Sequence, residues 1–96
     1  MHPRDAEGFE WREEDEDELW THRIRPSEVE QVRLNRPVWA PNKKYRRGDY
    51  IMVGETDGGR RLTIPVRVLP GTRRLQAITG WDSSRADLSK YGRDRK

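Results

Sequence analysis

One stretch, residues 49–69, constrains the fold more than any other part of the chain. Its first residues, DYIMVGE, predict a strand with mostly apolar side chains on both faces. The DGG segment that follows predicts a tight turn, because glycine accepts positive φ angles. Residues 61–69 then alternate between apolar side chains and Arg, Thr or Pro. The stretch therefore predicts an antiparallel hairpin and a fold built on a sheet.

The two faces of the second strand are expected to differ. Its apolar face carries four aliphatic side chains, Leu62, Ile64, Val66 and Val68. We expect this face to pack on helices, and the opposite face, with Arg61 and Arg67, to be basic and open. Pro65 lacks the N–H group that a strand ladder uses, so it predicts an edge position or a bulge.

The residues before the hairpin predict a short strand and two helices. A strand is expected at residues 9–11 and a helix at about 13–22, because the acidic run at its start suits the positive end of a helix dipole. Ser27 and Glu30 have the spacing of a capping box, which predicts a second helix. Pro37 is expected to end that helix.

The remaining segments complete the predicted fold class. Residues 36–48 predict a loop with a short extended piece near Val38, residues 75–81 a third antiparallel strand, and residues 85–91 a last short helix. The predicted fold is α+β, in the order β-α-α-β-β-β-α, with a small antiparallel sheet and helices packed on one face. We expect a flexible N-terminus at residues 1–7, one domain over 8–92 and a basic flexible tail at 93–96.

Composition excludes several classes of site. The 96 residues include no cysteine, which excludes disulfides and thiolate zinc sites. The acidic run at residues 13–18 is expected to be a solvated helix start, because metal sites draw ligands from converging elements. No apolar run is long enough to span a membrane, and no signal-peptide pattern is present. We expect a cytoplasmic protein that needs no metal or other cofactor.

Charge divides the chain into two parts. Residues 1–30 carry eleven acidic and four basic side chains, whereas residues 31–96 carry six acidic and sixteen basic ones. Such asymmetry favours a polyanionic partner for the basic part. The alternative is two solvated surfaces that attract only each other.

Three segments together resemble the BrnT-type toxins. The first comprises Phe9-Glu10-Trp11, the acidic helix that ends at His22, then Ile24, and finally Pro26-Ser27-Glu28-Val29-Glu30. The second is the hairpin from Gly48 to Arg60. The third is Ile78-Thr79-Gly80-Trp81-Asp82-Ser83-Ser84-Arg85, followed by Tyr91. The resemblance implies a RelE-like fold and a metal-independent ribonuclease toxin of a type II toxin–antitoxin system. It also implies a ribbon-helix-helix antitoxin as partner and RNA as substrate, with DNA contacted only through the antitoxin complex.

The chemistry that the resemblance implies requires few residue types. A base takes the proton of an RNA 2′-OH, which attacks the adjacent phosphorus, and cations stabilise the charge on the phosphoryl oxygens. The catalytic candidates are Glu55, Arg61 and His22. The RNA-binding candidates are Arg60, Arg67, Arg74, Trp81, Arg85 and Tyr91.

Each candidate also has a structural alternative. His22 is the kind of residue that caps or packs at a helix end, the arginines suit a solvated basic face, and the Tyr91 ring suits a core. Ser84 is expected to cap the last helix. A non-catalytic RNA-binding or protein-interaction module on the same fold therefore stays open as a second function.

Three positions depart from the family pattern. Arg23 stands where a glycine usually follows the histidine, so we expect the first helix to end by a different turn. Thr21 stands where a basic residue is common. Trp81 stands where an arginine is common, and it is suited to stack on a base but not to neutralise a phosphoryl group.

Overall fold

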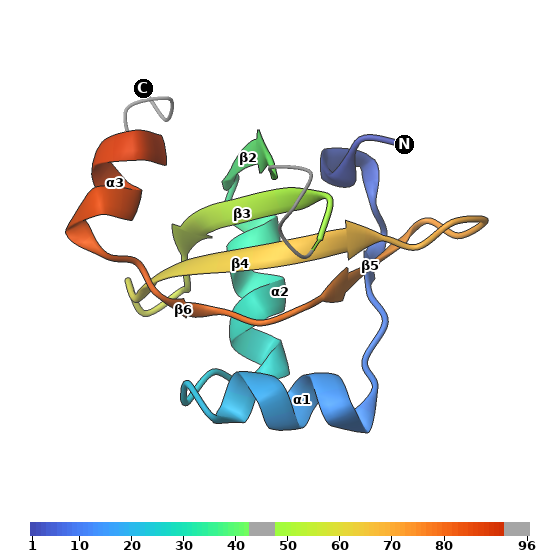
Figure 1. Ribbon diagram of the computed structural model, residues 1–96, viewed down its shortest axis with the longest axis horizontal. Coiled ribbons are helices and arrows are strands. Elements are labelled where there is room, and N and C mark those ends of the chain that lie inside the picture. Colours follow the sequence, from blue (N-terminus) through green and yellow to red (C-terminus); the bar gives the residue numbers. More distant parts are fainter. Residues whose placement is uncertain (43–47, 92–96) are drawn as a thin grey trace.

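The computed structural model describes residues 1–42 and 48–91, which form an α+β domain with a mixed sheet and three helices (Figure 1). Its centre is the predicted hairpin, in which β3 (Tyr50–Glu55) pairs antiparallel with β4 (Arg61–Val68). The hairpin prediction is confirmed because period-two alternation and a glycine turn are both local signals.

Strands on both sides extend the hairpin into a sheet of order β1-β5-β4-β3-β2, with β6 also pairing with β4. The added strands are β1 (Gly8–Phe9), β2 (Val38–Pro41), β5 (Arg74–Ala77) and β6 (Trp81–Asp82). The prediction of a purely antiparallel sheet is wrong, because β1 runs parallel to β5. The two helices that follow β1 carry the chain away from the sheet, so β1 has no hairpin partner.

The predicted third strand is divided at residues 78–80. β5 pairs with the end of β4 at residues 66–68, whereas β6 pairs with its start at residues 62–63. Pro65 lies between the two ladders, and its carbonyl accepts from the Ile78 N–H at 2.9 Å. A proline therefore stands in the most central strand, at the one place where the neighbouring ladder is interrupted.

The first two helices cover one face of the sheet. They are α1 (Glu13–Trp20) and α2 (Pro26–Leu34), and α2 crosses behind β3 and β4 in Figure 1. Their inner side chains join the predicted apolar face of β4 in a fully buried core, which contains Leu19, Ile24, Val29, Val32, Leu62, Ile64 and Val66.

The start of α2 differs from the predicted capping box. The helix begins with Pro26, and the Arg25 N–H donates to Glu28 Oε1 at 3.0 Å. Glu30 instead accepts from the Phe9 N–H at 3.0 Å and so ties α2 to β1. Proline at the first helical position, which needs no N–H donor, shifts the helix start toward the N-terminus.

The third helix, α3 (Arg85–Tyr91), lies on the opposite face of the sheet. Its Tyr91 ring packs in a second cluster with Ile51 and Val53, and Thr63 and Pro65 are buried on this face. The predictions of helices on one face only and of an open basic face are therefore wrong. Because β3 carries apolar side chains on both faces, both faces must be covered.

The N-terminal residues form a 3-10 turn, Pro3–Asp5, in which Pro3 is buried. Ala6 is buried as well, and the Glu7 N–H donates to the Arg73 carbonyl at 2.7 Å.

The expected basic tail at residues 93–96 lies outside the described residues. In the part of the chain that the structure describes, no helix has the length and apolar character needed to cross a membrane.

Candidate nucleic-acid interface

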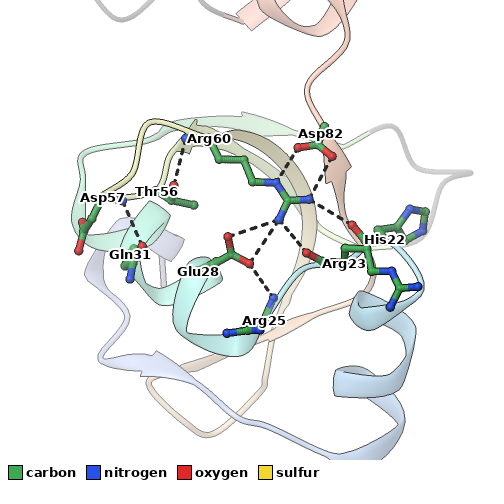
Figure 2. A network of polar contacts seen from close by, with 9 residues as sticks. All are labelled: His22, Arg23, Arg25, Glu28, Gln31, Thr56, Asp57, Arg60 and Asp82. Atoms are coloured by element: carbon green, nitrogen blue, oxygen red, sulfur yellow. Dashed lines mark hydrogen bonds and ion pairs between the residues drawn. The ribbon is translucent and has the colours of Figure 1, made fainter.

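Arg60 lies at the centre of a polar network at the hairpin end of the sheet (Figure 2). Its guanidinium binds Asp82 in a bidentate manner, with Nε to Oδ1 at 2.7 Å and Nη2 to Oδ2 at 3.0 Å. Nη1 contacts both Glu28 carboxylate oxygens at 3.3 Å. Two donors reach main-chain carbonyls, those of Arg23 at 2.7 Å and His22 at 3.1 Å.

These contacts occupy the donors of Arg60 in the folded chain. The hydrogen bond and charge of Asp82, with a further contribution from Glu28, outweigh desolvation and raise the pKa of Arg60. The hydrogen bond and charge of Arg60 likewise lower the pKa of Asp82, to which the charge of His22 also contributes. Arg60, which was predicted to bind RNA, thus connects the start of β4, β6 and the turn between α1 and α2.

The turn that Arg60 holds ends α1 in a Schellman motif. The Arg23 N–H donates to the Trp20 carbonyl at 2.9 Å and the Ile24 N–H to the Leu19 carbonyl at 3.1 Å. Arg23 has φ +58°, the left-handed conformation that glycine usually supplies. The prediction of a different turn is therefore wrong, because Arg23 adopts the glycine conformation despite its side chain.

His22 projects from this turn beside the Glu18 carboxylate. Its Nε2 lies 3.6 Å from Glu18 Oε2, and both side chains are about two-fifths exposed (40% and 44%). The same Glu18 oxygen accepts from the Thr79 hydroxyl at 2.8 Å, which anchors it to the segment after β5. A carboxylate that is itself hydrogen-bonded can fix the orientation of an imidazole, as catalytic histidines require.

The same turn carries an exposed aromatic side chain, Trp20, two residues before His22. The Trp20 ring is 46% exposed, and the guanidinium carbons of Arg23 and Arg25 lie 5.0 Å and 5.8 Å from its centroid. In the described contacts, neither guanidinium pairs with a carboxylate. A depression of about 500 Å³ adjoins this group, and Ser27, Glu28, Gln31 and Thr56 are among the residues that line it.

Trp20, Arg23 and Arg25 were not among the predicted site residues. The available signal was the W-x-x-R-x-R spacing around a helix end, with an arginine in a glycine position. Arginine in a left-handed conformation is unfavourable, and such residues concentrate at functional sites.

The other predicted catalytic residues lie on the α3 face of the sheet. Arg61 pairs with Glu55 across the ladder, with Nε 3.6 Å from Oε1. Their side chains share a face with Val53 and Thr63, which is opposite to the face covered by α1. The structure therefore places Glu55 and Arg61 together and His22 apart from them.

Trp81 in β6 and Ser84 both hydrogen-bond with Asp87 in the first turn of α3. The indole Nε1 donates to Asp87 Oδ2 at 2.9 Å, and the same oxygen accepts from the Ser84 N–H at 3.0 Å. The Ser84 hydroxyl in turn accepts from the Asp87 N–H at 3.0 Å, which confirms Ser84 as a helix cap. Burial pushes the pKa of Asp87 upward, but these hydrogen bonds, with one from Thr63, outweigh it and hold the pKa below its ordinary value.

The remaining RNA-binding candidates are dispersed. Arg67 and Arg85 are exposed on β4 and at the start of α3, and Tyr91 is buried in the second cluster. Arg74 Nη2 donates to the Phe9 carbonyl at 2.6 Å, at the opposite end of β4 from Arg60. These four residues do not converge on one place.

Comparisons of the chain with protein-family models, with curated proteins and with solved structures find no match.

Proposed function

We propose that this protein is a ribonuclease whose active site, at the turn between α1 and α2, cleaves single-stranded RNA. One observation carries the proposal: two guanidinium groups, neither paired with a carboxylate in the described contacts, flank an exposed Trp20 ring in the turn that also carries His22, whose Nε2 lies 3.6 Å from Glu18. An exposed aromatic ring with arginines is the arrangement by which proteins hold single-stranded nucleic acid, through stacking and phosphate contacts.

The proposed roles follow from the chemistry of each group. Trp20 stacks on a base next to the scissile bond, and Arg23 and Arg25 bind phosphoryl oxygens. His22 takes the proton from the 2′-OH, whose oxygen forms a bond to phosphorus. The bond from phosphorus to the 5′-oxygen breaks, and solvent gives that oxygen its proton. The products are a 2′,3′-cyclic phosphate and a 5′-hydroxyl end.

Arg60 and Glu18 act as positioning residues in this proposal. Arg60 binds the carbonyls of His22 and Arg23, so these two residues keep a fixed backbone before RNA arrives. Arg60 also neutralises Glu28 and Asp82, which would otherwise repel a phosphate near the turn. Preorganised charge of this kind contributes most to transition-state stabilisation.

The biological setting is proposed from the resemblance to BrnT-type toxins. We propose a RelE-like fold and a toxin of a type II toxin–antitoxin system, which acts in the cytoplasm without a metal ion. A ribbon-helix-helix antitoxin would neutralise it, and DNA would be contacted only through that complex. Expression of the chain alone is expected to arrest growth, and coexpression of the antitoxin to restore it.

A second function is favoured by one observation. Glu55 and Arg61, two of the predicted catalytic residues, pair with each other on the α3 face and lie apart from His22. A non-catalytic module would bind RNA or a protein through the same surfaces and cleave nothing.

An RNA cleavage assay separates the two functions. The purified protein in excess EDTA is incubated with a single-stranded oligoribonucleotide and with the same oligonucleotide carrying 2′-deoxy positions. The ribonuclease proposal expects cleavage of the first only, loss of cleavage in His22→Gln, and full cleavage in the control His2→Gln. RNA binding without cleavage by the unchanged protein would establish the binding module instead.

A further inference from the structure

A second concave surface lies at the other end of α2 from the His22 turn. It is a groove of about 680 Å³ between the N-terminal turn, the end of α2 and β2, and its lining includes Arg4, Arg33, Leu34, Arg36, Val38 and Trp39. In Figure 1 β2 lies near the top of the molecule and α1 at the bottom, so the groove is remote from the proposed RNA site.

The rim of this groove is basic. Arg4 and Arg36 are exposed, and in the described contacts neither guanidinium pairs with a carboxylate. Arg33 is already bound by Glu30, with Nε 2.8 Å from Oε1. A ligand with negative charge is therefore the complement of the rim.

The floor of the groove is apolar. Leu34 is 68% exposed, the highest value among the large apolar side chains that the structure describes. Val38 and Trp39 are half-buried beside it, and Trp39 packs against the main core. An exposed apolar floor inside a charged rim is typical of a protein-binding surface.

One wall of the groove is a sheet edge. β2 is the last strand of the sheet, and among the described residues no strand pairs with its outer side. Unpaired main-chain groups on an edge strand can receive an extended peptide as an added strand. Pro41 ends β2 and has no N–H, so the stretch available for pairing is short, Val38 to Ala40.

We propose that this groove binds an extended acidic segment of a partner protein, which pairs with β2. Acidic side chains of the segment meet Arg4 and Arg36, and apolar side chains between them cover Leu34 and Trp39. RNA fits the same surface less well, because it cannot pair with a strand edge and the most exposed side chain of the floor, Leu34, is aliphatic. This proposal is independent of the ribonuclease proposal.

Arg36 provides a test that does not threaten the fold. Its φ is +53°, so Arg36→Gly removes the guanidinium and leaves a residue that favours this backbone. Arg23 at the other surface has φ +58°, so Arg23→Gly is a matched control. A fluorescein-labelled peptide of alternating Glu and Val, with a Lys and Val peptide for comparison, serves as the probe.

Fluorescence anisotropy is expected to show binding of the Glu and Val peptide that weakens with added salt. Arg36→Gly is expected to weaken it about tenfold, and Arg23→Gly to leave it unchanged. Amide chemical shifts are expected to move at residues 38–40. Equal binding by Arg36→Gly, no binding of this peptide, or equally tight binding of the Lys and Val peptide would overturn the proposal.

The two proposals fail separately in this design. Binding of a single-stranded oligoribonucleotide is measured on the same variants, and it is expected to weaken in Arg23→Gly and to persist in Arg36→Gly. Loss of RNA binding in Arg36→Gly with peptide binding unchanged would make the groove a nucleic-acid surface and would overturn its assignment to a protein partner.

Discussion

The Arg60 guanidinium and the Asp82 carboxylate form a bidentate pair, with Nε and Nη2 2.7 Å and 3.0 Å from the two carboxylate oxygens. The pair joins the start of β4 to β6, and the remaining donors of Arg60 reach the α1–α2 turn and Glu28. Arg60 is expected to stabilise the fold mainly through its bonds to the main-chain carbonyls. The ion pair contributes less, because the Asp82 side chain is 64% exposed and solvent screens much of its charge.

Replacement of Arg60 is therefore expected to destabilise the fold. Arg60→Met leaves the carbonyls of His22 and Arg23 without their donors, at about 2 kcal/mol of unfolding free energy. Arg60→Lys is expected to recover only a small part, because one ammonium cannot reach all of these acceptors. Urea denaturation measures the difference, and Arg85→Lys, at an exposed position, is the control. A change below 0.5 kcal/mol in Arg60→Met would show that solvent replaces these bonds.

Acid is expected to weaken the fold partly through Asp87. Three donors share its Oδ2, namely Trp81 Nε1, the Ser84 N–H and the Thr63 hydroxyl. Because the folded pKa of Asp87 lies below the ordinary value of 3.8, its contribution is fully present above that pH and is lost as pH falls through the folded pKa.

Unfolding free energies measured from pH 7 to pH 2 in the Asp87→Asn variant test this assignment. The variant is expected to lose about 1 kcal/mol at pH 7 and to show a shallower decline below about pH 4 than the unchanged protein. Asp5→Asn, at an exposed position, should follow the unchanged protein. Parallel acid profiles for the unchanged protein and Asp87→Asn would remove Asp87 from the acid response.

Glycine is expected to stabilise the turns that follow α1 and α2. Arg23 and Arg36 have φ of +58° and +53°, which disfavours any residue with a Cβ. Arg36→Gly is expected to gain about 0.5–1 kcal/mol. Arg23→Gly should gain less, because the Arg23 guanidinium also contacts the Trp20 ring.

Alanine at the same positions separates the two causes in thermal denaturation. Arg36→Ala keeps the Cβ and should not raise the melting temperature, whereas Arg36→Gly should. If alanine stabilises as much as glycine, the cause is removal of the arginine charge and not relief of the backbone strain at positive φ.

Gly80 is expected to tolerate no side chain. A Cβ there would lie 3.1 Å from Leu19 Cδ2 and 3.2 Å from Ile24 Cδ1 and Ile64 Cγ1. All three side chains belong to the main core, so Gly80→Ala should lower the free energy of unfolding by about 1–3 kcal/mol. Gly58→Ala is the matched control, because its Cβ would meet only Thr56 Oγ1, at 3.9 Å. Equal effects of the two changes would mean that the core moves aside at no net cost.

Local signals in the sequence determined much of the secondary structure. The hairpin follows from alternation and a glycine turn, and α3 begins directly after its capping residue, Ser84. These features depend on residues within a few positions of one another, so the sequence alone contains their causes.

Tertiary structure decided which faces of the sheet are covered and which arginine side chains are engaged in contacts within the chain. The sequence alternation of β4 indicated an open basic face, but α3 returns to that face, where Tyr91 packs on Ile51 and Val53 and Asp87 accepts from the Thr63 hydroxyl. Arg60 binds groups 22 to 38 positions away, and no local pattern distinguishes it from the exposed Arg61 beside it. Such contacts exist only after distant segments have packed, because burial on both faces of the sheet, and not local preference, fixes where each segment lies.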